Sequence, residues 1–441
     1  MTLRRSKLLI LLLALALVAG ACRNDDGDGG DVSAGDDTEN TEGGEVKTDV
    51  GVTSEPCPEA VNADNGCIFL GTISDLTAGP FAALAVPITA SQKVFWAKVN
   101  ADGGIGGYDI DVTSYVRDNK YNPQVHKAKY DEIKTEVVGL IQTLGSPTTA
   151  AILSDLKAES VLSVPASWTS AWAFESVILE SGTNYCMEAM NSVDYAVTER
   201  QIKSVMAVHY PGDYGDDAAA GAKLAAERSE LTFTDVATNP GQEAQAEAIG
   251  RVVADKPDLV ILTTGPTEAA AIVGGAAAKG YKGAYIGTSP TWNPALLKSA
   301  AAPAITAQYM QSGPWSPWGG ATPGHEAMRA ALGASFTPND GATAGWVWSY
   351  PMKAALEAAV EAGDLTRAGL LKAAEGLDSV DYQGMLPSDA GNYTGDPNDR
   401  VFRQSVISKP DPAAPTGVAL VKEFFVGDTA KDFEFTAPCY G

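Results

Sequence analysis

The sequence predicts an α/β fold built from two doubly wound lobes, each with a parallel sheet. Short apolar runs alternate with amphipathic stretches along most of the chain, a pattern typical of βαβ units. The alternation occurs in two successive sets, the first starting at Ile68 and the second at Ser204. From Cys57 to the end, the 441-residue chain is too long for a single core and fits two domains of ordinary size.

In the first set, the apolar run at 68–73 predicts a buried strand. A helix follows and ends at Asn100, before Asp102 and Gly103. Residues 108–116 predict a strand because polar residues alternate with apolar ones. Helices at 124–134 and 147–157 alternate with strands at 137–141 and 161–164, and a further strand-like piece ends near Ala189.

The second set repeats this order. Apolar runs predict strands at 205–208, 231–236, 259–262 and 284–286. Amphipathic or Ala-rich stretches predict helices at 216–228, 242–254, 267–279 and 294–300. The last third of the chain differs, with long Ala-rich helices at 346–362 and 365–374 and a β-like tail at 401–407 and 418–425.

Residues 1–21 have the features of a secretory signal. Basic residues precede an unbroken apolar run at 8–18, and the small residues 19–21 precede Cys22. The apolar run is shorter than the roughly 20 residues that a membrane span needs. Small residues directly before a cysteine resemble the bacterial lipobox, which implies lipidation of Cys22 and anchoring to the outer face of a membrane. Simple secretion and an uncleaved anchor helix are the alternatives.

The segment after Cys22 is acidic and almost free of apolar residues up to Glu55. Such a composition cannot offset chain entropy by burial, so we expect 22–56 to be a disordered tether. The formal net charge of the chain is −24. Because phosphate binding needs a basic surface, nucleic acid is not expected as a partner.

Four cysteines remain apart from Cys22, an even number that suggests two disulfides in an exported chain. Cys57 and Cys67 bracket a short loop and are paired here, which leaves Cys186 with Cys439. Four cysteines allow three pairings, so the other connectivities stay open. No metal is expected, because there is no C-x-x-C and the three histidines are isolated.

At several points the chain resembles the type I substrate-binding proteins of ABC importers, the family of the leucine/isoleucine/valine-binding proteins. The resemblance rests on the order and spacing of seven short motifs, at 71–80, 99–107, 145–149, 165–168, 213–216, 257–261 and 279–281. It implies two lobes joined by a hinge of three crossings, placed here near 191–198, 307–315 and 384–397. The N-terminal lobe then contains 68–190 and 315–383, and the C-terminal lobe 198–307 and 398–441. Only about 192–200 remains for the helix that the family has before the second lobe, so we expect a shortened hinge segment.

Doubly wound sheets bind ligands at the carboxyl ends of their strands, so a ligand is expected between the two lobes. Hydroxyls and free backbone N–H groups at helix starts suit a carboxylate, although each such Ser or Thr also serves as an ordinary helix cap. The expected ligand-binding residues are Thr77, Ser146, Thr148, Thr149, Ala166, Ser167, Trp168 and Thr169 in the first lobe, and Tyr214, Thr264, Gly265 and Ser289 in the second.

The resemblance implies an extracytoplasmic solute-binding lipoprotein that delivers a small polar solute, such as an amino acid, to ABC permease subunits. The loop at 287–292 lacks the acid that amino-acid binders of the family place on the ligand's ammonium. Glu268 is a substitute or a first-turn charge that stabilises its helix. Trp168, Trp172 and Trp292 either stack on a flat ligand or pack the lobe edges.

We expect a monomer without cofactors and without catalytic activity. The alternatives are a ligand-sensing module of the same fold and a serine-type cell-wall enzyme. The enzyme is suggested only by Ser154 and Lys157 in an S-x-x-K pattern, without its K-T-G or S-D-N partners.

Overall fold

The computed structural model describes residues 46–440. The predicted signal at 1–21, the lipidation site Cys22 and most of the predicted tether lie outside the described residues. Within 46–440, no helix is both long and apolar enough to cross a membrane.

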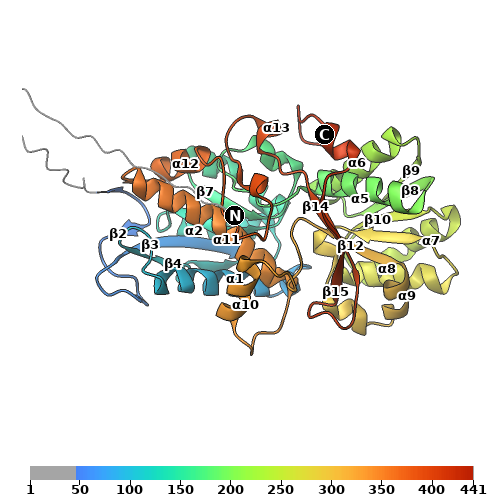
Figure 1. The fold of residues 1–441 in the computed structure, drawn as a ribbon, viewed down its shortest axis with the longest axis horizontal. Helices are drawn as coiled ribbons and strands as arrows, with labels where there is room; N and C mark the ends of the chain where they lie inside the picture. Colours follow the sequence, from blue (N-terminus) through green and yellow to red (C-terminus); the bar gives the residue numbers. More distant parts are fainter. Residues whose placement is uncertain (1–45, 441) are drawn as a thin grey trace, which may run out of the picture. The chain divides into compact units, whose positions relative to one another are not determined.

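The first sheet has six strands, which all come from the N-terminal part of the described chain (Figure 1). Its central strand, β3, pairs in parallel with β4, β5 and β6, and β6 pairs in parallel with β7. All but one of the nine residues of β3 are buried, as expected for a strand covered on both faces. The strands are β2 (Val52–Thr53), β3 (Gly66–Ser74), β4 (Tyr108–Asp111), β5 (Val116–Asp118), β6 (Gly139–Leu144) and β7 (Leu162–Ala166).

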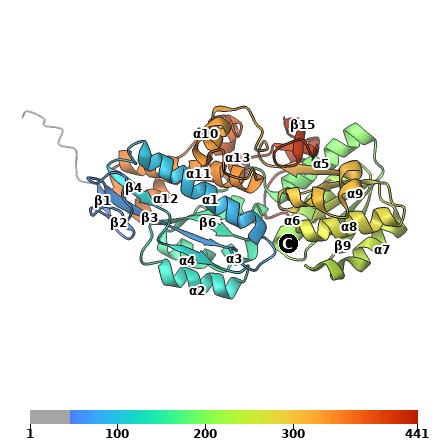
Figure 2. The ribbon, with the colours of Figure 1, turned by 90° about the horizontal axis from the view of Figure 1, so that it is seen from below.

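Helices from two distant parts of the chain cover this sheet. The long helix α11 (Asp340–Glu361) packs against α1 (Ala82–Ala101) and α12 (Arg367–Glu375), and Figure 2 shows α1 and α11 side by side. Trp96 of α1 and Trp346 of α11 are among the largest fully buried side chains. The remaining helices here are α2 (Pro123–Ile133), α3 (Ser146–Ala150), α4 (Leu153–Glu159), η1 (Ser170–Phe174) and α10 (Pro323–Leu332).

The second sheet has seven strands in the order β15-β14-β12-β11-β10-β8-β9. Its strands are parallel from β9 to β12, whereas β14 and β15 are antiparallel at one edge. The strands are β8 (Ser204–His209), β9 (Thr232–Ala237), β10 (Leu259–Thr263), β11 (Ala284–Gly287), β12 (Tyr309–Gly313), β14 (Ser405–Pro410) and β15 (Val418–Phe425). Its helices are α5 (Tyr185–Arg200), α6 (Asp213–Arg228), α7 (Ala246–Asp255), α8 (Pro266–Ala278) and α9 (Ala302–Gln308). The predicted α/β class with parallel sheets is confirmed.

The predicted disordered tether is too long at its C-terminal end. Two short strands form before Glu55: β1 (Lys47–Thr48) pairs with β13 (Asp364–Leu365), and β2 pairs with β3. The register places Val52 opposite Ile68 at the edge of the sheet. Composition alone missed these strands because each has only two residues and the segment around them is polar, although Val46 and Val52 pack against the core.

The expected shortened hinge segment is wrong, because α5 is a full helix of 16 residues. Asn184 caps it by accepting a hydrogen bond from the Met187 backbone N–H. The first nine residues of α5 are all buried, so the sequence shows no polar face and was interpreted as a strand ending near Ala189. Gly221 of α6 allows α5 to pack closely, since a Cβ there would lie about 2.1 Å from the Cys186 carbonyl.

The three crossings lie at other positions than predicted. Ile178 bridges to Ser163 of the first sheet, whereas α5 packs on α6 and the second sheet, so the first crossing is at 179–184 rather than 191–198. The second runs from the end of β12 to the start of α10, at 314–322, and overlaps the predicted 307–315 only at its end. The third is at 401–404 rather than 384–397, because α13 (Pro397–Arg400) still contacts η1 of the first lobe.

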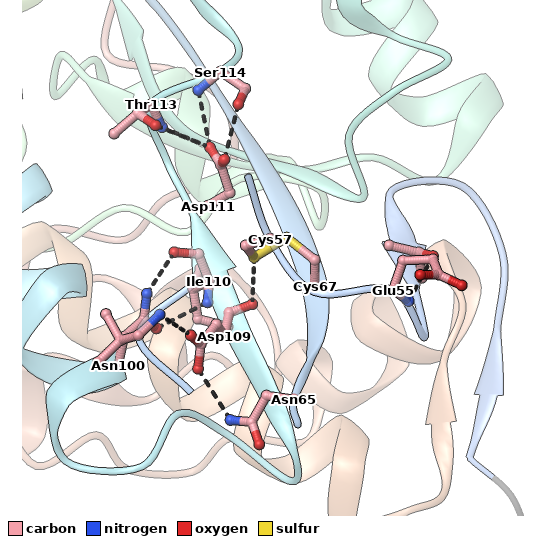
Figure 3. The surroundings of a disulfide bond; sticks show 12 residues. Glu55, Cys57, Asn65, Cys67, Asn100, Asp109, Ile110, Asp111, Thr113 and Ser114 are labelled. Carbon is pink, nitrogen blue, oxygen red and sulfur yellow. Dashed lines mark hydrogen bonds between the residues drawn. A yellow bond between two sulfur atoms is a disulfide. The ribbon is translucent and has the colours of Figure 1, made fainter. Parts of the chain in front are cut away.

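Both predicted disulfides are confirmed. Cys57–Cys67 lies within the first lobe, where the loop between the two cysteines folds over the buried carboxylate of Asp109 (Figure 3). That carboxylate accepts hydrogen bonds from the Asn62 backbone at 2.9 Å and from the side chain of Asn65 at 3.0 Å. The second disulfide, Cys186–Cys439, attaches the end of the chain to the first turn of α5.

The predicted range placed all of 398–441 in the second lobe. The last residues of this range instead also contact the first lobe. Residues 426–440, called here the C-terminal strap, first contact α5, where the Thr429 N–H donates to Asp194 at 2.7 Å. The strap then reaches the first lobe, where Phe435 meets Phe174 with ring centroids 6.5 Å apart. The Cys439 N–H donates to Ser170 Oγ of η1 at 2.8 Å. The strap therefore joins the two lobes beside the three crossings.

Candidate ligand-binding site

A cavity lies between the two sheets, at the ends where their parallel strands finish. Its first-lobe wall includes the residues after β6 and β7, and its second-lobe wall the residues after β11 together with β12. The space open to the centre of a water molecule is about 110 Å³. A cavity at the carboxyl ends of doubly wound sheets is where such folds hold ligands.

Aromatic side chains dominate the wall of this cavity. Trp168, Trp315 and Trp348 pack together, with ring centroids 4.8 to 5.8 Å apart. Across the cleft, Phe81 of the first lobe meets Tyr214 of the second, with centroids 6.1 Å apart and the rings nearly perpendicular. The aromatic members of the wall are Phe81, Tyr121, Trp168, Tyr185, Tyr214, Trp292, Trp315 and Trp348. Such a wall gains free energy by removing apolar ligand surface from water.

Few polar groups of the wall remain for a ligand. Ser167 Oγ accepts from Trp172 Nε1 at 3.2 Å, and the Gln311 amide donates to the backbone oxygens of Thr288 and Ser312. Ser146 Oγ, by contrast, is buried and has no hydrogen-bond partner among the described residues. Since an unpaired buried hydroxyl costs free energy, it marks a place where a ligand acceptor or donor is favourable.

The described wall contains no Lys, Arg or His, and Asp340 is its one carboxylate. Asp340 is the first residue of α11, and its Oδ1 accepts from the Trp318 N–H at 2.9 Å. Burial raises the pKa of Asp340 to about 6, against hydrogen bonds from Trp318 and the Thr416 hydroxyl that lower it. The cavity therefore offers an ionised or acidic group but no cation.

A second acid, Glu188 of α5, lies behind the second-lobe wall. Its carboxylate accepts from the Ser289 N–H at 2.8 Å and from the Ser289 hydroxyl, which positions the loop after β11. Burial raises the pKa of Glu188 to about 8, although the hydrogen bonds from Ser289 oppose this shift. Glu188 is fully buried and shapes the wall rather than lining it.

Half of the twelve residues predicted from the sequence line the cavity. They share positions directly after a strand or at the start of a helix, and they are Ser146, Ala166, Ser167, Trp168, Tyr214 and Ser289. Tyr214 presents its ring to the cavity, while its hydroxyl bonds to the Thr264 carbonyl and to Thr288.

The other six predicted residues do not line it. The hydroxyls of three of them form local hydrogen bonds. Thr148 donates to the Leu144 and Gly145 carbonyls and Thr149 to the Thr143 carbonyl, whereas Thr169 caps η1 by accepting from the Ala171 N–H. Thr77 donates to Asp118 at the first-lobe surface. Thr264 and Gly265 lie behind Tyr210 and Tyr214, where the Gly265 N–H donates to the Tyr210 hydroxyl at 2.9 Å. The capping alternative applies to Thr169 alone among these six.

Of the additional candidates, only Trp292 joins Trp168 in the wall. Trp172 packs in the first-lobe core. Glu268 accepts from the Gly241 N–H at 2.7 Å and is absent from the wall, so it does not take the place of the family's ligand-binding acid.

Sequence reasoning missed the residues that reach the cavity from the second crossing and from α11, among them Trp315, Asp340 and Trp348. Asp340 and Trp348 follow no strand, and Trp315 follows β12, which was not among the predicted strands, so the rule that located the other residues gave no signal. The clustering of tryptophans at 315–318 and 346–348 was the available clue.

Hydrogen bonds also join the lobes beside the cavity. Ser170 of η1 donates to the buried Asp217 of α6 through its backbone N–H, at 2.9 Å, and through its hydroxyl. Cys186, Asp217 and Cys439 form the one group among residues 46–440 with metal-like spacing. Both of its sulfurs are joined in the disulfide, so this group does not supply thiolate ligands.

Comparison with known proteins agrees with this geometry. A family model described as periplasmic binding protein matches residues 68–407. A fatty acid ABC transporter substrate-binding protein from Thermomonospora curvata is similar over 88% of this chain and 97% of its own, with 27% identity and a TM-score of 0.80. No curated protein sequence matches the chain.

More distant structures share the fold. A branched-chain amino acid ABC transporter protein from Thermus thermophilus, solved with valine, has 16% identity and a TM-score of 0.73, covering 83% of this chain and 98% of its own. A leucine-binding protein from Thermotoga maritima has 13% identity and a TM-score of 0.69, covering 82% of this chain and 99% of its own.

Proposed function

This chain belongs to the periplasmic binding protein family and is an extracytoplasmic solute-binding protein of ABC transporters, and we propose that its ligand is an apolar chain with a small polar head, such as a fatty acid. The observation that carries the proposal is the wall of the cavity, with eight aromatic side chains and no cation. An apolar ligand gains about 25 cal/mol for each Å² of its surface removed from water.

The sequence favoured a small polar solute such as an amino acid. An α-amino acid carries an ammonium and a carboxylate, and burying each charge requires a partner. Asp340 is the one acid of the described wall, and it already accepts hydrogen bonds from Trp318 and Thr416. The similarity to the fatty acid transporter protein, at 27% identity, adds support for an apolar ligand.

The ligand's polar head has a candidate partner in Ser146. Ser146 lines the cavity, and its buried hydroxyl has no partner among residues 46–440, while Ser167 and Ser289 lie in the same wall. Hydroxyls and backbone N–H groups bind a carboxyl group through hydrogen bonds without needing a cation. Ser146 is therefore the proposed head-group contact of the first lobe.

We further propose that the protein is a monomer held at the outer face of the cell membrane through a lipid on Cys22, from where it delivers its ligand to permease subunits. Anchoring raises the concentration of a binding protein near its transporter. A ligand that binds the closed arrangement of the two lobes more tightly than the open one shifts the protein toward the closed arrangement. We propose that the transporter recognises this closed, ligand-bound form.

Binding to purified protein tests the ligand class. Octanoate, 1-octanol and leucine are added separately, and the midpoint of thermal unfolding is measured at each concentration. A ligand that binds only the folded state raises this midpoint by mass action. We expect octanoate and octanol to raise it and leucine to leave it unchanged; a rise with leucine alone would overturn the proposed ligand class.

A further inference from the structure

Asp340 differs from the other polar residues of the cavity wall because it introduces charge into an apolar space. It starts α11 in the first lobe, and the Thr416 hydroxyl, which donates to it, comes from the turn between β14 and β15 in the second. The Thr416 carbonyl in turn accepts from Trp292 Nε1, and Trp292 lines the cavity. Asp340 is thus held where both lobes meet.

We propose that Asp340 is a specificity-determining residue that discriminates against ionised head groups, so that the cavity takes its ligand as a neutral molecule or together with a proton. This inference rests on the proposed function, because it concerns the ligand of that same cavity. It predicts preferential binding of alcohols, amides or protonated acids over free carboxylates.

The charged groups around Asp340 do not neutralise it. Arg329 of the neighbouring helix α10 directs its guanidinium to the carbonyls of Trp318 and Gly320, at 2.7 and 2.8 Å. His325, on the same helix, is buried and bonds to Thr322 and to the Ser316 carbonyl. Burial, with a smaller contribution from Arg329, lowers its pKa, so it is neutral at pH 7.

Among the described residues, the neighbouring strands β14 and β15 carry Lys409 and Lys422, which are exposed and are not part of the cavity wall. Asp411, in the turn after β14, accepts from the Ala413 N–H and carries the same sign of charge. The first turns of α1 contain no charged residue, and on α11 itself the next one is Lys353, more than three turns further along. The wall phenols of Tyr185 and Tyr214 have raised pKa values, chiefly through burial, and stay neutral.

Asp340 is half-buried in the cavity wall, so water screens the repulsion between its charge and a second negative charge there only partly. Burial already raises the pKa of Asp340 to about 6. A bound carboxylate raises it further, so binding between pH 6 and 8 takes up a proton from solution. The proton is shared between Asp340 and the ligand, and no covalent bond changes. By linkage, affinity for a carboxylate is highest below pH 6 and falls as pH rises above it.

Glu188, behind the opposite wall, is a second acid with a raised pKa. A test must therefore distinguish the effect of its ionisation on binding from the effect of Asp340. Glu188 reaches the cavity only through Ser289, and its raised pKa of about 8 places its ionisation at higher pH. Glu188→Gln keeps an acceptor for Ser289 and removes the titration, and it serves as the matched control.

Calorimetric titration of the purified protein with octanoate tests the inference. Measured at pH 7 in two buffers with different ionisation enthalpies, it reports the number of protons taken up per ligand bound. We expect uptake approaching one proton for octanoate, and roughly 20- to 30-fold weaker binding at pH 8 than at pH 6.5. Octanol is expected to bind without proton uptake and equally at both pH values.

Asp340→Asn is expected to increase the affinity for octanoate at pH 8. Misfolding of the variant would lower this affinity, so the two outcomes are distinguishable. The variant is expected to bind octanoate about tenfold more tightly than the wild type at pH 8 and to abolish proton uptake, whereas Glu188→Gln keeps the uptake at pH 7. Octanoate binding without proton uptake, or uptake that persists in Asp340→Asn, overturns the inference while leaving the proposed function intact. If neither octanoate nor octanol binds, the proposed ligand class fails, and this inference fails with it.

Discussion

Cys439, at the end of the C-terminal strap, is disulfide-bonded to Cys186 in the first turn of α5. The Cys186 N–H and the Ser170 hydroxyl both donate to Asp217, and the Cys439 N–H donates to Ser170. Ser170 belongs to the first lobe, whereas Cys186 and Asp217 belong to the second. The end of the chain is thereby fixed to both lobes beside the hinge, so it restrains how far they separate.

Replacing Cys186 and Cys439 together by Ser is expected to loosen the hinge and lower stability. A disulfide typically contributes about 2–4 kcal/mol to the free energy of unfolding by restricting the unfolded chain. Small-angle X-ray scattering of the ligand-free variant should give a larger radius of gyration, and ligand should dissociate faster. The matched control replaces Cys57 and Cys67, which both lie in the first lobe: it should lose stability without a change in lobe separation. Equal radii for the two variants would contradict a role of the strap at the hinge.

Glu188→Gln is expected to change how stability depends on pH. Because the folded state holds the Glu188 proton up to about pH 8, whereas an exposed glutamate loses it near pH 4.5, the folded state binds more protons between these values. The wild type therefore loses stability as pH rises through this window, at up to about 1.4 kcal/mol per pH unit from this one group. Urea unfolding at several pH values should show a smaller loss in the variant. Identical slopes would mean that Glu188 is already ionised in the fold.

Phe81→Ala should weaken ligand binding by removing a side chain that meets the other lobe across the cavity. An aromatic pair contributes about 0.5–1.5 kcal/mol beyond the area it buries, so a loss of roughly tenfold in affinity is expected. Tyr214→Phe is the control, because the Tyr214 ring faces the cavity while its hydroxyl bonds to Thr288 and Thr264. Calorimetry with octanol measures both. A strong effect of Tyr214→Phe with none of Phe81→Ala would contradict the arrangement described here.

Ser146→Ala separates ligand binding from stability. The Ser146 hydroxyl is buried without a protein partner, so its removal should leave the midpoint of urea unfolding unchanged or slightly higher. A lost hydrogen bond to the ligand head costs about 1 kcal/mol, which corresponds to roughly fivefold weaker binding. Thr149→Ser, at a hydroxyl that bonds only the Thr143 carbonyl and lies outside the cavity wall, should keep full affinity. Unchanged affinity in Ser146→Ala would place the ligand head elsewhere.

The regular parts of the fold followed from hydrophobic patterning. The predicted strands at 68–73 and 259–262 correspond to β3 and β10, because continuous apolar runs between turn residues are typical of buried parallel strands. The helix α5 was missed because its first nine residues are all buried, polar ones included, so this half shows no separate apolar and polar faces. β1 and β2 were missed because each has only two residues, too few to show a period of two.

Residues of the cavity wall could be placed from the sequence where the local sequence determines their position. Ser146 and Trp168 directly follow strands, so the rule for doubly wound sheets placed them at the cavity. Trp315, Asp340 and Trp348 reach it only because the chain returns to the first lobe after β12, and their positions depend on tertiary packing. For this reason, the residues that follow predicted strands did not by themselves indicate that the cavity wall is apolar.

Calorimetric titration of the purified protein with octanol and with leucine under the same conditions tests the central claim, that the cavity between the lobes holds an apolar chain. We expect saturable binding of octanol that weakens about tenfold in Phe81→Ala, and no heat of binding with leucine. Saturable binding of leucine, with none of octanol, would contradict it.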